Sequence, residues 1–91
     1  MYDLQITPGA EGDIAKLGQR IPKQDFERLR RAIMNLAEEP RPHGVKKIRG
    51  TERAVFRIRV GNYRVIYNVY DKDNQVRIVE VVRRTETTYR A

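Results

Sequence analysis

The alternation of apolar and polar residues predicts one short strand followed by two helices. Residues 2–6 alternate with a period of two, the pattern of a half-buried strand. Thr7-Pro8-Gly9 interrupts this pattern, and a short helix is expected over residues 10–19. A second helix follows Pro22, which suits a first helical position, and ends before Pro40. Its apolar side chains recur at helical spacing and form one face: Phe26, Leu29, Ile33 and Leu36.

The second half of the chain is predicted to be β-structure. Strands are expected at about 54–60, 63–70 and 76–83, with a weaker strand at 45–49. The order of one strand, two helices and then several strands predicts an α+β fold, with a helical hairpin packed on an antiparallel sheet. A chain of 91 residues has room for a single core, so residues 1–91 are expected to form one domain.

The dipeptide Gly61-Asn62 predicts a two-residue hairpin turn between two of these strands. This turn pairs Val60 with Tyr63 and Arg59 with Arg64. One face of the hairpin is then apolar and suits burial under the helices. The opposite face, which we call the arginine face, carries Val55, Arg57, Arg59, Arg64, Ile66 and Asn68.

Two arginines directly opposite each other are unfavourable for stability. A sheet that needed only stability would place Thr or Glu opposite Arg59. The arginines could simply extend into water, but their clustering favours a binding function.

The register of the last hairpin has two solutions. A four-residue loop, 71–74, would put Glu80 on the core face, where a lone carboxylate is costly. A five-residue loop, 71–75, is therefore preferred. It is expected to bury Val79 and Val81 and to place Ile78, Glu80, Val82 and Arg84 on the arginine face, where Glu80 would be a counter-charge for Arg64.

Charge and composition narrow the classes of function. Nineteen Lys and Arg against twelve Asp and Glu give a net charge of +7, and most of the basic residues are arginine. Guanidinium groups match phosphate geometry and stack on bases, so a nucleic-acid partner is expected, although an acidic protein partner would also fit. The chain has no cysteine and one histidine, His43, so no metal or other cofactor is expected. No signal peptide or membrane span is predicted, which indicates a cytoplasmic protein.

The first of two motifs comprises Lys47-Ile48-Arg49-Gly50 and the run from Phe56 to Tyr67, FRIRVGNYRVIY. It resembles the core of the RelE/ParE toxins of bacterial and archaeal toxin–antitoxin systems. The second, from Arg83 to Tyr89, is similar to the closing basic and tyrosine segment of the RelE branch. The resemblance implies a toxin held by a cognate acidic antitoxin. In the RelE branch it implies an endoribonuclease that cuts mRNA on the ribosome.

Carried over by position, the resemblance implies a catalytic set of Arg57, Arg64, Arg84 and Tyr89. Residues expected to bind RNA are Arg59, Lys46, Lys47, Arg49 and Arg83. Two of the matched positions, Arg57 and Arg59, are lysines in the best-known member. Arginine does not act as a general base, so proton transfer would fall to Tyr89 or Glu80. Alternatives are a ParE-like inhibitor of DNA gyrase and a non-catalytic family member that only binds antitoxin.

Overall fold

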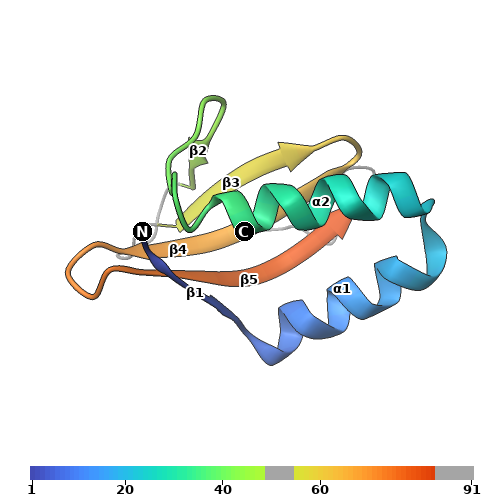
Figure 1. The fold of residues 1–91 in the computed structure, drawn as a ribbon, viewed down its shortest axis with the longest axis horizontal. Coiled ribbons are helices and arrows are strands. Elements are labelled where there is room, and N and C mark those ends of the chain that lie inside the picture. The colour runs from blue at the N-terminus through green and yellow to red at the C-terminus, as the bar shows by residue number, and fades with distance from the viewer. Residues whose placement is uncertain (49–54, 84–91) are drawn as a thin grey trace.

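Two helices lie on one face of a five-stranded sheet, as Figure 1 shows. The computed structural model describes residues 1–48 and 55–83. In chain order the elements are β1 (Asp3–Ile6), α1 (Pro8–Arg20), α2 (Lys23–Asn35), β2 (Lys46–Lys47), β3 (Val55–Val60), β4 (Tyr63–Tyr70) and β5 (Gln75–Arg83). The α+β fold with an N-terminal strand and a helical hairpin is confirmed.

The strand order in the sheet is β1-β5-β4-β3-β2. Strands β2 to β5 are antiparallel to their neighbours, whereas β1 pairs in parallel with the first half of β5. The first and last of the described strands, β1 and β5, are therefore adjacent. The helical hairpin forms the connection that carries the chain from β1 across the sheet.

Helix α1 begins two residues earlier than the sequence predicted. The Thr7 hydroxyl accepts a hydrogen bond from the backbone N–H of Ala10, and Pro8 occupies the start of the helix. Both residues are typical of a helix N-terminus, so the segment that was predicted to be a break is a cap. Near the other end of α1, Gly18 lies against the ring of Phe26 from α2. A Cβ at this position would lie 3.2 Å from the ring, so the glycine allows the helices to approach.

Helix α2 follows the predicted apolar pattern but ends at Asn35, several residues before Pro40. Pro22 is its N-cap rather than its first helical residue. Leu29, Ile33 and Leu36 are buried, and Phe26 is half-buried. They pack on the apolar face of the sheet, whose buried residues are Phe56, Ile58, Tyr63, Val65, Tyr67, Val69, Val76, Ile78 and Val81.

The last hairpin combines the two registers that the sequence allowed. Tyr70 pairs with Gln75, so the loop has four residues and not the five that were predicted. A bulge at Val79 then shifts the register by one residue, so that Tyr67 pairs with Ile78 but Ile66 pairs with Glu80. The predictions for Val81, Glu80 and Val82 are confirmed. Those for Ile78, which is buried in the core, and Val79, which is 38% exposed, are wrong. The bulge explains both errors because one extra residue reverses the faces beyond it.

Candidate nucleic-acid interface

The β3–β4 hairpin places Arg59 directly opposite Arg64, as predicted. The strands are joined by the two-residue turn Gly61-Asn62, and Gly61 has a φ of 59°. A positive φ at the first turn position favours glycine, because other residues carry a Cβ that clashes there. The turn therefore fixes the register that brings the two guanidinium groups to one face of the sheet.

The register arranges the arginine face in rows that cross several strands. One row contains Arg59, Arg64 and Val82, and the next contains Arg57, Ile66 and Glu80. Consecutive rows are two residues apart along a strand, or roughly 6.6 Å. The bulge at Val79 is what brings Glu80 to this face. The row of Arg57 extends on its other side to Lys46 of β2.

Helices α1 and α2 both pack on the opposite side of the sheet, against β5 and β3. Ile66, which lies between Arg57 and Glu80 in their row, is nevertheless only 6% exposed. Arg57 and Arg64 are half-buried, and Arg59 is exposed. The Nε atom of Arg64 is itself buried, so part of this guanidinium group is covered. The face is thus a semi-buried cationic surface rather than a set of separate solvated charges.

The predicted site residues divide into three groups. Arg57, Arg59, Arg64 and Lys46 share the arginine face. Lys47 pairs with Phe56 and Arg83 with Tyr63, so the register puts both on the helix side of the sheet. Arg83 there lines a recess of about 290 Å³ with Lys16 and Arg20 of α1. The remaining predicted residues, Arg49, Arg84 and Tyr89, lie outside the described residues.

Glu80 is the acidic residue of this face among the described residues of β3, β4 and β5. It lies diagonally across from Arg64, whose direct partner is Val82. Diagonal neighbours in an antiparallel sheet are within reach of long side chains. The role of Glu80 as a counter-charge for Arg64 stays a prediction.

A second polar cluster, which sequence reasoning missed, joins the N-terminus to the β4–β5 loop. The Arg41 guanidinium donates two hydrogen bonds to the Asp71 carboxylate, at 2.8 and 3.3 Å, and the Tyr2 hydroxyl donates a third at 2.8 Å. The hydrogen bonds from Arg41 and Tyr2 hold the pKa of Asp71 below its usual range, and the bond to Asp71 raises the pKa of Tyr2. All three are far apart in the sequence, so no local motif reveals them.

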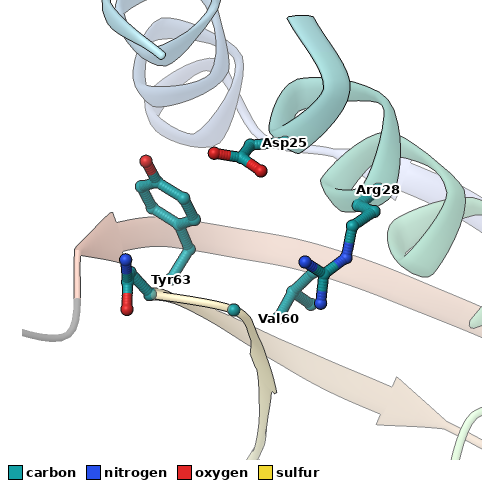
Figure 2. A pocket seen from close by; sticks show the side chains of 6 residues that line it. Asp25, Arg28, Val60 and Tyr63 are labelled. Carbon is teal, nitrogen blue, oxygen red and sulfur yellow. The ribbon is translucent and has the colours of Figure 1, made fainter. Parts of the chain in front are cut away.

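Two recesses flank the tip of the β3–β4 hairpin on the helix side. The smaller, about 80 Å³, lies between α2 and the turn, where Asp25 and Arg28 face Tyr63 and Val60 (Figure 2). The larger, about 690 Å³, runs between the second half of α2 and β3 and includes Arg59 and His43. His43 is exposed, as expected for a residue of a Pro/Gly loop. Its neighbours Glu38 and Glu39 make this groove mixed in charge, which is less suited to a phosphate backbone than the arginine face.

Two further features of the described ranges bear on function. No group of three or more His, Cys, Asp or Glu in residues 1–48 and 55–83 is arranged to hold a metal ion. No helix in this part of the chain is long and apolar enough to cross a membrane.

The family model of the ParE toxin of the type II toxin–antitoxin system parDE matches residues 4–88. This covers nearly the whole chain and decides its class. The chain belongs to the RelE/ParE superfamily of type II toxins. No curated protein matches it.

Solved structures of RelE/ParE toxins have the same fold. RelE from the archaeal RelE–RelB complex of Pyrococcus horikoshii is 30% identical, with a TM-score of 0.76, and the match covers 94% of this chain and 98% of that one. The toxin–antitoxin complex RelBE2 of Mycobacterium tuberculosis contains a chain that is 26% identical, with a TM-score of 0.74 and coverage of 91% and 98%. Isolated Escherichia coli RelE is 21% identical, with a TM-score of 0.73 and coverage of 97% and 89%. The resemblance to RelE/ParE toxins is confirmed.

Proposed function

We propose that this toxin is an endoribonuclease that cuts mRNA on the ribosome and binds the scissile phosphate on its arginine face. The observation that carries the proposal is the placing of Arg57, Arg59 and Arg64 in two adjacent rows on the helix-free face of the sheet. Like charges in this arrangement are unfavourable for the fold alone. A polyanionic ligand offsets the repulsion between these arginines, so the same arrangement suits a binding site.

The chemistry suits an internal phosphoryl transfer. The 2′-hydroxyl of a ribose attacks the adjacent phosphorus, the P–O5′ bond breaks, and a 2′,3′-cyclic phosphate and a 5′-hydroxyl remain. Arg57 and Arg64 would donate hydrogen bonds to the non-bridging oxygens, where negative charge develops. Arginine holds its protons at neutral pH, so it stabilises charge but does not accept the proton.

Proton transfer would fall to other groups. Glu80, which is in the row of Arg57, would accept the proton of the 2′-hydroxyl. The resemblance to RelE also implies Arg84 and Tyr89, and these two residues stay predictions. Tyr89 would then protonate the 5′ oxygen that leaves.

Ribosome binding is supported by the exposed face of α2. Arg31 is exposed on that helix, and Arg28, also exposed, lies at the recess beside the β3–β4 turn. A ribosome would position the mRNA, and cationic side chains of this kind bind its RNA backbone. The likeness to RelE at 30% identity supports this dependence.

We also propose that the toxin is neutralised by an acidic, amphipathic antitoxin. The toxins of the Pyrococcus and Mycobacterium structures are in complexes with antitoxins. This chain has a net charge of +7 and an apolar recess of about 140 Å³ between β1, α1 and α2. Ile6 and Met34, which line the recess, are 37% and 54% exposed. An acidic segment with apolar side chains on one face would cover this surface and offset the charge.

A second candidate function is inhibition of DNA gyrase, because the matching family model is that of the ParE toxin. The two candidate functions differ in the molecule that the toxin damages. Gyrase inhibition leaves mRNA intact and stabilises gyrase–DNA cleavage complexes. The arginine face favours the nuclease because a contact with gyrase protein does not require arginines paired across two strands on the helix-free face.

Expression in cells without the antitoxin tests the proposal. Growth should stop, and primer-extension mapping should find mRNA cuts inside translated codons, with none in untranslated transcripts. Arg64→Ala should remove the cuts, whereas Lys23→Ala, a loss of one positive charge on the helix side, should retain them. Intact mRNA together with gyrase–DNA cleavage complexes would favour the second candidate.

A further inference from the structure

The arginine face continues beyond Arg57 into a region of different chemistry. The next row of the sheet contains Asn68 of β4, Arg77 of β5 and Gln5 of β1. The row after it contains Tyr70, Gln75 and, on β1, Asp3. Going along β4, the face therefore changes from paired arginines to amide, guanidinium and aromatic groups, which are the groups that recognise bases rather than phosphates.

Arg77 and Tyr70 form a preassembled stack. The guanidinium carbon of Arg77 lies 5.2 Å from the centre of the Tyr70 ring, and its Nη2 donates a hydrogen bond of 3.2 Å to Oε1 of Gln75. The contact with the Tyr70 ring and the hydrogen bond to Gln75 together fix the orientation of the Arg77 guanidinium group. A fixed, partly buried guanidinium offers a flat surface on which a nucleobase can stack, at little cost in side-chain entropy.

Asn68 is the second, independent observation. Its side chain is on the helix-free face and is only 7% exposed. Within residues 1–48 and 55–83 its amide makes no side-chain hydrogen bond. Among the described residues, the Asn68 amide is not one of the fully enclosed groups that lack a partner, so it stays within reach of a ligand or water. An amide presents a donor and an acceptor side by side, the pattern that pairs with the edge of a base.

The spacing agrees with a single strand of RNA. The Asn68–Arg77 row lies one row from Arg57 and two rows from Arg64. Rows about 6.6 Å apart are comparable to successive nucleotides of an extended strand. A phosphate held by Arg57 and Arg64 would therefore place a flanking nucleotide over Asn68 and Arg77.

We propose that Asn68, Tyr70 and Arg77 form a nucleobase subsite that selects the mRNA sequence next to the cut. The subsite rests on the proposed function, since it takes the scissile phosphate to be bound at the arginine face. The base stacks on the Arg77 guanidinium, and the Asn68 amide bonds its edge. The ligand is one base of single-stranded RNA.

Binding of short single-stranded RNAs to the purified toxin tests this subsite separately from cleavage. The probes are fluorescent tetranucleotides with a 2′-O-methyl group on each ribose, which blocks attack, and they differ in one base at a time. The wild type should prefer one base at one position at least fivefold. Asn68→Ala and Arg77→Ala should bind the preferred base roughly tenfold more weakly and lose the preference. Arg77→Lys, which keeps the charge but not the plane, should lose it too, and circular dichroism should confirm that each variant is folded.

Two control variants separate base recognition by this subsite from the non-specific attraction of RNA to positive charge. Arg57→Ala should weaken the binding of all probes alike and keep the base preference. Arg20→Ala, on α1, should change neither the affinity nor the base preference. Equal binding of all four bases by the wild type, an unchanged preference in Asn68→Ala and Arg77→Lys, or no RNA binding at all would overturn the subsite.

Mapping mRNA cuts with the same variants distinguishes the two proposals. If the wild type cuts and the variants keep its sequence preference, the subsite is wrong and the nuclease stands. If the wild type binds with a base preference that the variants lose but does not cut, the nuclease is wrong, and Asn68 and Arg77 bind a base without selecting a cut.

Discussion

Arg59 of β3 and Arg64 of β4 are direct cross-strand partners. Between them the chain reverses at Gly61-Asn62, and one residue, Val60 or Tyr63, separates each arginine from the turn. Stability does not favour two like charges at such positions. The same register puts Arg57 one row away on the same face. The proposed activity depends on these three positions.

Arg64→Ala should abolish mRNA cleavage without unfolding the toxin. Loss of one donor to a developing oxyanion typically lowers the rate by about 100-fold or more. The measurement is the rate of cleavage by the purified variant, with its thermal unfolding as a control for the fold. Arg84→Ala is expected to act in the same way. Full activity in both variants would remove the proposed site.

Binding of RNA should weaken steeply as the salt concentration increases, because each arginine that binds a phosphate releases a counterion from the RNA. For single strands the slope of log K against log salt changes by about 0.7 for each phosphate contact. Arg57→Ala should therefore reduce the steepness of the slope by about 0.7, and Lys23→Ala should leave it unchanged. A slope that is the same in Arg57→Ala and the wild type would place Arg57 outside the phosphate contacts.

Asp13 is expected to stabilise the end of β5 that extends beyond β1. Its carboxylate accepts a hydrogen bond of 3.0 Å from the backbone N–H of Val81. Asp13→Ala leaves this N–H without its acceptor and should lower the free energy of unfolding by about 1–2 kcal/mol. Asp13→Asn keeps an oxygen acceptor and should lose less. Urea denaturation measures both, and equal losses would show that the hydrogen bond is not the cause.

Tyr67→Phe should also destabilise the fold. The Tyr67 side chain is fully buried, and its hydroxyl donates a hydrogen bond of 2.7 Å to the carbonyl oxygen of Pro40. Burial raises the pKa of this phenol well above its ordinary value. Removing the hydroxyl leaves the carbonyl unpaired, at a cost of about 1–2 kcal/mol. Tyr63→Phe is the control, because the Tyr63 hydroxyl makes no hydrogen bond within the described ranges, and a similar loss in both would contradict the prediction.

The cluster of Arg41, Asp71 and Tyr2 should make stability depend on acid pH. The hydrogen bond from Arg41, followed by that from Tyr2, lowers the pKa of Asp71 in the folded state. The stabilisation is therefore complete above the unfolded pKa of about 3.9 and is lost as the pH falls through the lower folded value. Urea midpoints of the wild type and Asp71→Asn should differ at pH 7 and converge below about pH 4. A difference that stays constant with pH would contradict this.

The features that follow from local pattern were predicted, and those that depend on distant contacts were not. The Gly61-Asn62 turn and strict alternation specify the β3–β4 register completely, and with it the arginine face. The bulge at Val79 was missed because the prediction assumed one register for the whole hairpin. The cost of burying Glu80 gave its correct face, but the same reasoning misplaced Ile78.

Long-range contacts leave no local signal. The pairing of β1 with β5 and the contact of Arg41 with Asp71 join residues that are far apart in the chain. The half-buried state of Arg57 and the buried amide of Asn68 likewise became visible only in the structure. Arg49, Arg84 and Tyr89 lie outside the described residues, so their predicted roles stay predictions.

The most direct test of the nuclease uses purified ribosomes programmed with one defined mRNA and the purified toxin. We expect a cut within the codon in the ribosomal A site, a 2′,3′-cyclic phosphate at the new 3′ end, and no cut with Arg64→Ala. Intact mRNA with the folded wild-type toxin, or cutting by Arg64→Ala at the wild-type rate, would contradict the claim that the arginine face cleaves RNA.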